Sequence, residues 1–192
     1  MTSYPLDKSS IIVQAGMGVG KSKQEAIYLK SLAEKYGEDN MIVIKLSHRK
    51  AFTAQEVKRL NEETGLPFVS HDDVAGQQIS LSTNRYIVIQ YESLHKILNQ
   101  WGLHGRKLVL LCDEWNSILR QMESKAGVPG DDMVAFQTLV KFSSHSVFMD
   151  ACTNVNSVEV CQSFLRDAGK EMPHMIINTY QKHQDNGTEL IP

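Results

Sequence analysis

Residues 11–22, IIVQAGMGVGKS, decide the fold of this chain. An apolar run is followed by a glycine-rich turn, and a Lys-Ser pair then begins a segment with helical periodicity. Glycine tolerates positive φ and has no Cβ, so the backbone N–H groups of such a turn can converge on an anion. The N-terminus of the following helix adds a partial positive charge. The stretch therefore predicts a phosphate-binding loop between a buried strand and a helix.

The whole loop is predicted to bind ATP through residues Ala15, Gly16, Met17, Gly18, Val19, Gly20, Lys21 and Ser22. Lys21 is expected to reach the β- and γ-phosphates and so to take part in catalysis, and the Ser22 hydroxyl is expected to ligate Mg²⁺. Ala15 stands where the usual pattern has glycine, but a small side chain still permits the tight turn. The alternative interpretation is a glycine-rich turn that only connects a strand to a helix.

A second apolar run, residues 108–112, ends in the acidic pair Asp113 and Glu114. Ligands of α/β sheets gather at the carboxyl ends of the strands, so this pair is expected near the phosphate-binding loop. Asp113 suits a contact to Mg²⁺, which prefers oxygen ligands. Glu114 suits the catalytic role of orienting or deprotonating the attacking water. The alternative is two solvated carboxylates at the start of a helix, where the helix dipole favours them.

Short apolar runs alternate with helical patterns along the rest of the chain. Most runs are continuous in hydrophobicity, which is typical of strands buried on both faces of a parallel sheet. Segments 21–36 and 155–168 place apolar side chains on one helical face and are predicted to pack on that sheet. The pattern predicts an α/β fold with right-handed crossovers and a mostly parallel sheet. The predicted strands are 11–15, 41–46, 86–90, 108–112, 146–149 and 175–177, with a further short strand at 67–70.

Length and charge limit the functions that the chain can have. With 192 residues it has room for one domain. Its formal net charge of −2 excludes a global basic surface, so any contact with nucleic acid must come from a local patch and should be weak without help.

No apolar stretch is long enough to cross a membrane, and the polar first ten residues lack the apolar core of a signal peptide. The three cysteines have spacings that suit neither a disulfide framework nor a zinc site. These features predict a nuclear or cytoplasmic protein that is not secreted and has no membrane partner.

Together with the loop and the acidic pair, three further segments make the chain resemble superfamily-2 helicases. Residues 47–50 (SHRK) and 90–94 (QYESL) each follow a predicted strand, and residues 149–153 read MDACT. The phrases SHRKAF, DEWNSILRQM and MDACTN are most similar to origin-of-replication-binding proteins of the herpesvirus type. The resemblance covers about residues 11–165.

The resemblance implies a RecA-like P-loop NTPase fold and the activity of an ATP-dependent DNA helicase, with Mg²⁺ as cofactor and single-stranded DNA as partner. It also assigns roles to residues outside the loop and the acidic pair. The residues implied to contact nucleic acid are Ser47, Arg49, Lys50, Gln90 and Ser93. The residues implied to couple ATP turnover to strand binding are Asp150, Ala151 and Thr153.

Two departures from the family pattern carry expectations of their own. Asn116 stands where relatives carry an acidic or histidine residue, which puts the coupling contact in question. The chain after Thr153 is too short for the second RecA-like domain that supplies an arginine finger in such helicases. We therefore expect that a second domain acts in cis or in trans and that the isolated chain is a weak ATPase.

Two other functions remain open at this point. The chain could be an ATP-binding switch or scaffold that does not turn ATP over, or a small P-loop NTPase or kinase. The predicted organisation is an N-terminal tail at 1–10, an ATP-binding domain at 11–180, and a tail or the start of a linker at 181–192.

Overall fold

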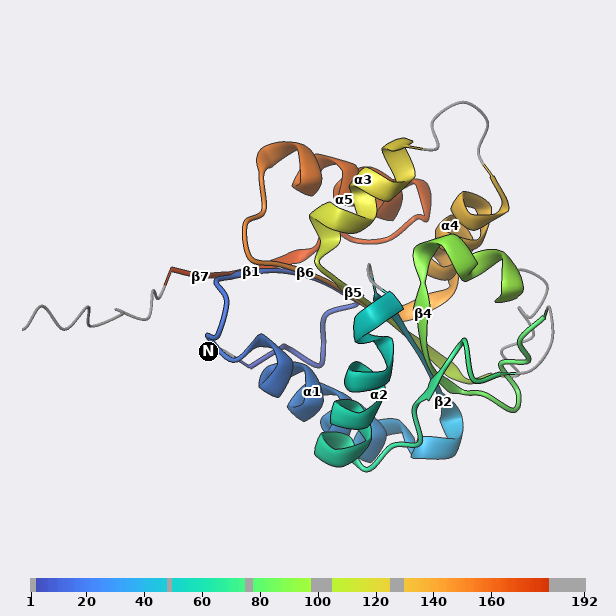
Figure 1. Cartoon of the computed structure of the whole chain (residues 1–192). Coiled ribbons are helices and arrows are strands. Elements are labelled where there is room, and N and C mark those ends of the chain that lie inside the picture. The colour runs from blue at the N-terminus through green and yellow to red at the C-terminus, as the bar shows by residue number, and fades with distance from the viewer. Residues whose placement is uncertain (1–2, 48–49, 75–77, 98–104, 125–129, 180–192) are drawn as a thin grey trace, which may run out of the picture.

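The computed structural model describes residues 3–47, 50–74, 78–97, 105–124 and 130–179. Strands and helices alternate along the chain (Figure 1). The strands are β1 (Ser10–Ala15), β2 (Met41–Ser47), β3 (Val69–Ser70), β4 (Tyr86–Gln90), β5 (Lys107–Asp113), β6 (Ser143–Asp150) and β7 (His174–Asn178). The α-helices are α1 (Lys21–Tyr36), α2 (Lys50–Thr64), α3 (Trp115–Ser124), α4 (Asp131–Phe142) and α5 (Val155–Asp167), with 3₁₀ segments η1 (Glu38–Asn40) and η2 (Tyr91–Ile97).

The seven strands form one sheet in the order β3-β4-β2-β5-β6-β1-β7, and every recorded strand pair is parallel. β1 lies between β6 and β7, and β5 lies between β2 and β6 at the centre of the sheet. Because the strands are parallel, their carboxyl ends share one edge. The predicted phosphate-binding loop follows β1 and the acidic pair lies at the end of β5, so both lie at this edge.

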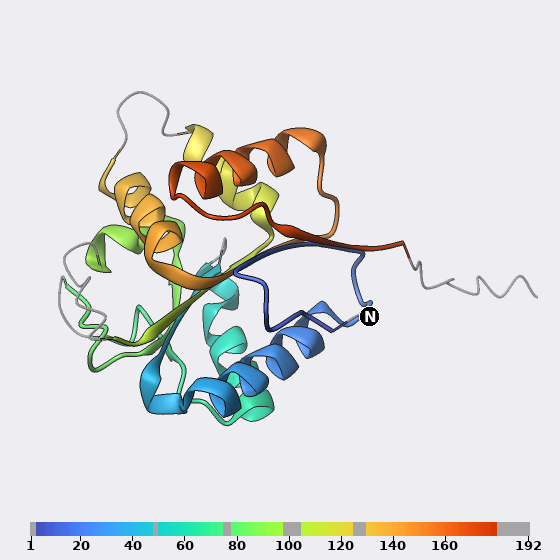
Figure 2. The same ribbon diagram turned by 180° about the vertical axis from the view of Figure 1, so that it is seen from behind.

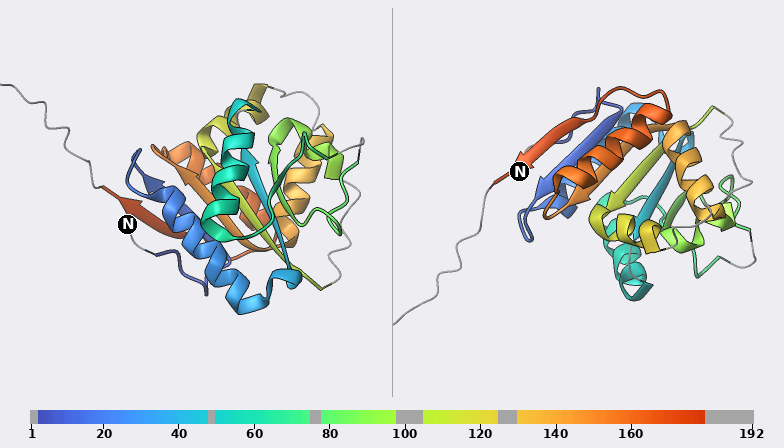
Figure 3. Two further views of the ribbon diagram at one scale, coloured as in Figure 1. Left: turned by 60° about the horizontal axis from the view of Figure 1, so that its bottom comes forward. Right: turned by 90° about the horizontal axis from the view of Figure 1, so that it is seen from above.

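Helices cover both faces of the sheet (Figures 1 and 2). α1 and α2 lie side by side on one face, while α3, α4, α5 and η2 lie on the other (Figure 3). Alternate residues of each strand enter two separate cores: Ile42 and Ile44 face α3–α5, whereas Met41 and Val43 face α1 and α2. The sheet is thus buried on both faces, as the continuous apolar runs predict.

The predicted elements are confirmed in type and close in extent. All six predicted strands are present, and the optional seventh, at 67–70, is the two-residue β3. α1 spans the predicted range 21–36, and α5 ends one residue before the predicted limit of 168. No helix within the described ranges is long and apolar enough to cross a membrane.

The segment predicted as an N-terminal tail, 1–10, contributes to the core. Tyr4 is buried, and its ring makes an edge-on contact with Tyr28 of α1, with ring centroids 5.6 Å apart. Its hydroxyl donates to the Met149 Sδ at 3.5 Å. Ser10 already belongs to β1. Packing of the domain therefore begins before residue 11.

Aromatic rings fill the core between the sheet and helices α3–α5. Trp115, directly after the acidic pair, stacks on Phe136 of α4 with centroids 5.8 Å apart and meets Phe148 of β6 edge-on at 4.9 Å. Its indole Nε1 donates to the Ser157 carbonyl at 3.1 Å. This packing fixes the start of α3, and with it the backbone that carries the acidic pair.

We predict that Phe136→Ala destabilises the protein by about 3–5 kcal/mol, because truncating a fully buried phenylalanine loses apolar burial and leaves a cavity. Phe142→Ala on the same helix is the matched control, since Phe142 is 47% exposed, and it should cost about 0.5 kcal/mol or less. Urea unfolding followed by circular dichroism measures both. Equal costs for the two variants would contradict this account of the core.

Candidate functional site

The loop between β1 and α1 is shaped to receive an anion. Gly18 and Gly20 have φ of 72° and 92°, in the left-handed region that other residues rarely adopt. Gly20 caps α1, no side chain hydrogen-bonds the helix N-terminus there, and the first turn holds no acidic residue. The first backbone N–H groups of α1 are therefore available to an anion, and the helix dipole favours one.

Lys21 lies across the mouth of this loop. Its Nζ donates to the carbonyl oxygens of Ala15 and Gly16, the latter at 2.9 Å. These contacts hold the ammonium group where a phosphate chain entering the loop would meet it. Two of the three ammonium donors are thus already used, so a triphosphate entering the loop would accept the third or replace a carbonyl.

The acidic pair ends β5 with an unusual backbone conformation. Asp113 Oδ1 accepts the Glu114 N–H at 3.0 Å. Glu114 has a φ of 52°. Among the described residues it is the only one other than glycine with a positive φ. Such a conformation costs of order 1–3 kcal/mol and persists where the surroundings enforce it, commonly at functional sites. The turn directs Glu114 to solvent, where it is exposed.

The segment after β6 is joined to the start of α3. Asp150 is buried and accepts two backbone N–H groups, from Asn116 at 2.8 Å and from Cys152 at 3.0 Å. The Asn116 side chain donates to the Cys152 carbonyl at 2.5 Å. Asn116 therefore links the acidic pair to residues 150–152, although it replaces the residue usual in helicases at that position.

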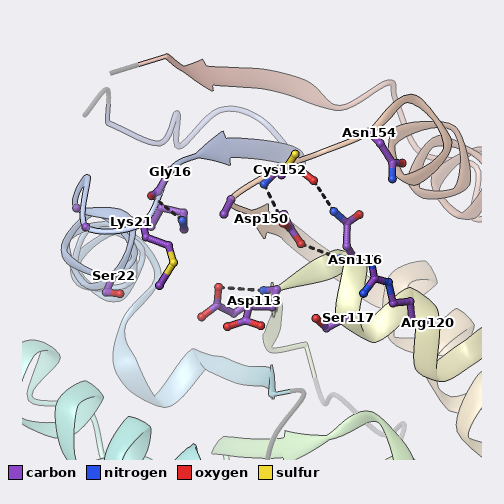
Figure 4. A pocket seen from close by; sticks show the side chains of 15 residues that line it. Gly16, Lys21, Ser22, Asp113, Asn116, Ser117, Arg120, Asp150, Cys152 and Asn154 are labelled. Carbon is purple, nitrogen blue, oxygen red and sulfur yellow. Dashed lines mark hydrogen bonds between the residues drawn. The ribbon is translucent and has the colours of Figure 1, made fainter. Parts of the chain in front are cut away.

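One cavity of about 750 Å³ brings these parts together (Figure 4). Lys21 and Ser22 lie on one side, Asn116, Ser117 and Arg120 on the other, and Asp113 and Asp150 between them. The full lining is Gly16, Met17, Gly18, Gly20, Lys21, Ser22, Asp113, Glu114, Asn116, Ser117, Arg120, Asp150, Ala151, Cys152 and Asn154.

Some predicted residues do not line this cavity. Ala15 is buried at the end of β1, and Val19 packs against the core that faces α1. Thr153 Oγ1 is buried and has no hydrogen-bond partner among the described residues. Conversely, Ser117 and Arg120 line the cavity but were not predicted from the sequence. Their spacing from Asn116 puts all three side chains on the polar face of α3.

Four of the five residues predicted to contact nucleic acid follow or end strands at the same edge of the sheet. Ser47 and Gln90 end β2 and β4, and Ser93 lies in η2 directly after β4. Lys50 begins α2, whereas Arg49 lies outside the described residues. Ser47 lines a second cavity of about 790 Å³ that also touches Ser22, Asp113 and Glu114. This cavity therefore adjoins the first one.

A buried ion cluster, formed by Glu25, Lys45, Glu56 and Arg59, lies between α1, β2 and α2. Lys45 is 1% exposed, and its Nζ donates to both Glu25 carboxylate oxygens, at 2.6 and 2.8 Å, and to Glu56. The same Nζ is 3.8 Å from Asp113 Oδ2. The cluster thus extends to the acidic pair.

Arg59 closes the cluster on the side of α2. It donates to Glu25 at 2.6 Å and to Glu56 at 2.5 Å, and at its exposed side to Glu63 at 2.6 Å. It also donates to the Ser22 carbonyl at 3.2 Å. The cluster was not predicted from the sequence. The lysine within the apolar run MIVIKLS is nevertheless a signal, because a buried lysine requires a partner of opposite charge.

Charge within the cluster is stabilised by its own members. Burial would lower the pKa of Lys45, but the Glu25, Asp113 and Glu56 carboxylates outweigh it and raise that pKa. Burial would raise the pKa of Glu56, but Lys45 and Arg59 outweigh it and lower that pKa to about 2. Lys45 and Glu56 are therefore both charged at neutral pH. Burial raises the pKa of Glu25, against the opposing effect of the two cations.

Comparisons with known proteins agree with this architecture. A family profile described as "Origin of replication binding protein" matches residues 1–185. The replication origin-binding protein of human herpesvirus 6A (strain Uganda-1102) is 31% identical over 157 residues, which cover 81% of this chain and 18% of that protein. The chain thus spans less than a fifth of that relative's length.

Among solved structures, a DEAD box protein from Methanococcus jannaschii matches with a TM-score of 0.60 and 15% identity, over 89% of this chain and 46% of that one. Mss116p, solved with ssRNA and AMP-PNP, matches with a TM-score of 0.63 and 14% identity, over 93% of this chain and 38% of that one. The fold is the RecA-like domain of such helicases, as the resemblance implies.

We predict that Glu56→Gln weakens the acid sensitivity of the fold. Because the folded state lowers the pKa of Glu56 from 4.5 to about 2, its contribution to stability is present above about pH 4.5 and is lost as the pH falls towards 2. Urea unfolding should therefore show a smaller loss of stability between about pH 5 and pH 2 in the variant than in the wild type. Glu62→Gln, at an exposed position of the same helix, is the control. A wild-type slope in Glu56→Gln would refute the ionic role of Glu56.

Proposed function

This chain belongs to the family of origin of replication binding proteins, and we propose that it is the ATP-binding first motor domain of a DNA helicase of that type. The observation that carries the proposal is the convergence, in one cavity, of an uncapped helix N-terminus, Lys21 and the acidic pair. A cationic, donor-rich loop facing two carboxylates suits a triphosphate that arrives with a divalent cation.

Mg²⁺ would be held by the Ser22 hydroxyl, the Asp113 carboxylate and the phosphates of ATP. Oxygen donors fit this hard cation. Within the described residues, no group of three or more His, Cys, Asp or Glu side chains could hold a metal ion by itself. Mg²⁺ is usually bound by one or two carboxylates together with substrate phosphates and waters, which is the arrangement proposed here. When bound, Mg²⁺ supplies neutralisation of the charge on the phosphates.

Glu114 is the proposed general base. Glu114 lines the cavity together with the residues of the loop, and its side chain is exposed at the end of β5, where the backbone has a positive φ. There it can orient a water molecule towards the γ-phosphate and accept its proton. Lys21 stabilises the charge on the transferred group, in exchange for its present contacts with Ala15 and Gly16.

Single-stranded DNA is the proposed partner, with Ser47, Arg49, Lys50, Gln90 and Ser93 as contacts. Ser47, Gln90 and Ser93 lie at the carboxyl edge of the sheet, next to the nucleotide cavity. Contacts to the phosphate backbone would fix the position of the strand without reading its bases. With a net charge of −2, the affinity of this chain alone should be low and sensitive to salt.

Asp150, Ala151 and Thr153 are proposed to couple nucleotide turnover to strand binding. The hydrogen bonds from Asn116 to Asp150 and to the Cys152 carbonyl support this role, since any shift of the acidic pair must move residues 150–152. A second RecA-like domain, in cis or in trans, would complete the cleft and supply an arginine. An arginine finger contributes about 10³–10⁵ in rate in related systems, so hydrolysis by this chain alone should be slow.

We predict that Lys21→Ala weakens the binding of Mg·ATP by about 1.5–3 kcal/mol, roughly tenfold to a hundredfold in Kd, through loss of a charge-assisted contact to phosphate. Lys23→Ala, which removes an exposed lysine from the same helix, is the matched control and should bind like the wild type. Isothermal titration calorimetry measures both. Equal affinity in Lys21→Ala and wild type would remove the assignment of the phosphate-binding loop.

We predict that Glu114→Gln retains nucleotide binding and abolishes hydrolysis, because an amide keeps the shape of the side chain but cannot accept a proton. Single-turnover hydrolysis of radiolabelled ATP, with protein in excess, detects slow chemistry. Unchanged hydrolysis in Glu114→Gln would show that Glu114 is not the base. Binding without hydrolysis in the wild type, with and without single-stranded DNA, would favour an ATP-binding switch instead.

A further inference from the structure

Lys45 is a charged residue in the interior of an otherwise apolar strand. It is 1% exposed, whereas lysine side chains are almost never fully buried unless they are paired. Side chains along β2 alternate between the two faces of the sheet. Lys45 therefore lies on the same face as Val43, the face covered by α1 and α2. β5 lies directly beside β2, with Lys45 opposite Leu111, so Asp113 is two residues further along β5 on that same side.

The buried ion cluster touches both residues that we propose as Mg²⁺ ligands. Lys45 Nζ is 3.8 Å from Asp113 Oδ2, and Arg59 donates to the Ser22 carbonyl at 3.2 Å. Glu25 joins the two cations, since it accepts from Lys45 at 2.6 Å and from Arg59 at 2.6 Å. A rigid framework thus connects the carboxylate of β5 to the first turn of α1.

Stability alone does not explain such a cluster. Removing charged groups from water costs several kcal/mol per ion, and apolar replacements of buried ion pairs are often neutral or stabilising. A leucine or methionine at position 45 would continue the apolar run of β2. The lysine differs from such an apolar residue because it places a fixed positive charge next to the Asp113 carboxylate.

We propose that Lys45 is a positioning residue that orients the Asp113 carboxylate towards Mg²⁺, and that Glu25 and Arg59 fix Lys45 in place. The inference rests on the proposed function, because it concerns the metal of that same nucleotide site. The Lys45 ammonium group attracts Asp113 Oδ2, while the Glu114 N–H donates to Asp113 Oδ1 at 3.0 Å. The carboxylate is thereby fixed at both oxygens before nucleotide arrives.

The test is a charge-balanced double variant, Lys45→Met with Glu25→Gln. It removes one positive and one negative charge from the interior, so the net charge of the cluster is preserved while the Lys45–Asp113 contact and the Glu25–Arg59 ion pair are lost. A fluorescent ATP analogue is titrated with MgCl₂, and its binding in EDTA serves as the internal reference. Thermal unfolding followed by circular dichroism verifies that the variant is folded.

We expect the Mg²⁺ concentration for half-saturation to rise about tenfold. This is the lower end of the loss in metal affinity that follows removal of a residue that orients a metal ligand. Binding of the analogue in EDTA should stay within about twofold of the wild type, because the loop and Lys21 hold the phosphates. Lys58→Met removes an exposed charge that lines the adjoining cavity and should leave the Mg²⁺ dependence unchanged. In an Asp113→Asn background, the double variant should cause no further change, since the two positions would then act as one unit.

An unchanged or lowered half-saturation concentration in the folded double variant would overturn the proposal. If the double variant does not fold, Arg59→Lys carries the test, because Arg59 is 20% exposed and its replacement keeps the charge but loses the paired contacts to Glu25 and Ser22. A rise in the half-saturation concentration is then expected, smaller than that of the double variant, and no rise would overturn the proposal. Failure of the wild type to bind the analogue under any condition would instead refute the proposed function.

Discussion

The parallel arrangement of the strands is the constraint on which the rest of this molecule depends. Since every recorded strand pair is parallel, each strand delivers the residues that follow it to a single edge of the sheet. The loop after β1, Asp113 at the end of β5 and Asp150 at the end of β6 lie far apart in sequence but line one cavity. Helices on both faces supply the apolar burial that keeps such a sheet folded. Most residues of the candidate site thus follow strand ends, and most of the packing is provided by strand interiors, with Lys45 of β2 as an exception.

Much of this could be predicted from the sequence, because strands buried on both faces produce continuous apolar runs and a glycine-rich turn before Lys-Ser is typical of a phosphate-binding loop. The strand positions, the extent of α1 and the meeting of the loop with the acidic pair all follow from local patterns and from strand direction. Lys45 and Glu25 could not be predicted as partners, since they lie on different elements and only the packing of α1 against the sheet brings them together. The contact from Asn116 to the Cys152 carbonyl is likewise a product of tertiary structure, because it joins α3 to the end of β6.

In the proposed function, nucleotide binding would be an exchange of interaction partners. Lys21 already donates to two carbonyl oxygens. Asp113 already has an ion pair with Lys45 and accepts a hydrogen bond from the Glu114 N–H. The net gain from a triphosphate is therefore smaller than the sum of its contacts, as in any exchange of hydrogen bonds. In return, few side chains have to be ordered when ligand arrives, which limits the entropic cost of binding.

The positive φ of Glu114 has a consequence for laboratory evolution of this domain. Glycine adopts that backbone conformation without strain, so a selection for thermal stability alone should enrich glycine at position 114. The same exchange deletes the carboxylate that lines the cavity. If Glu114 is the proposed base, selection for stability and selection for turnover favour different residues at position 114, and a library screened on both properties measures the cost of keeping glutamate there.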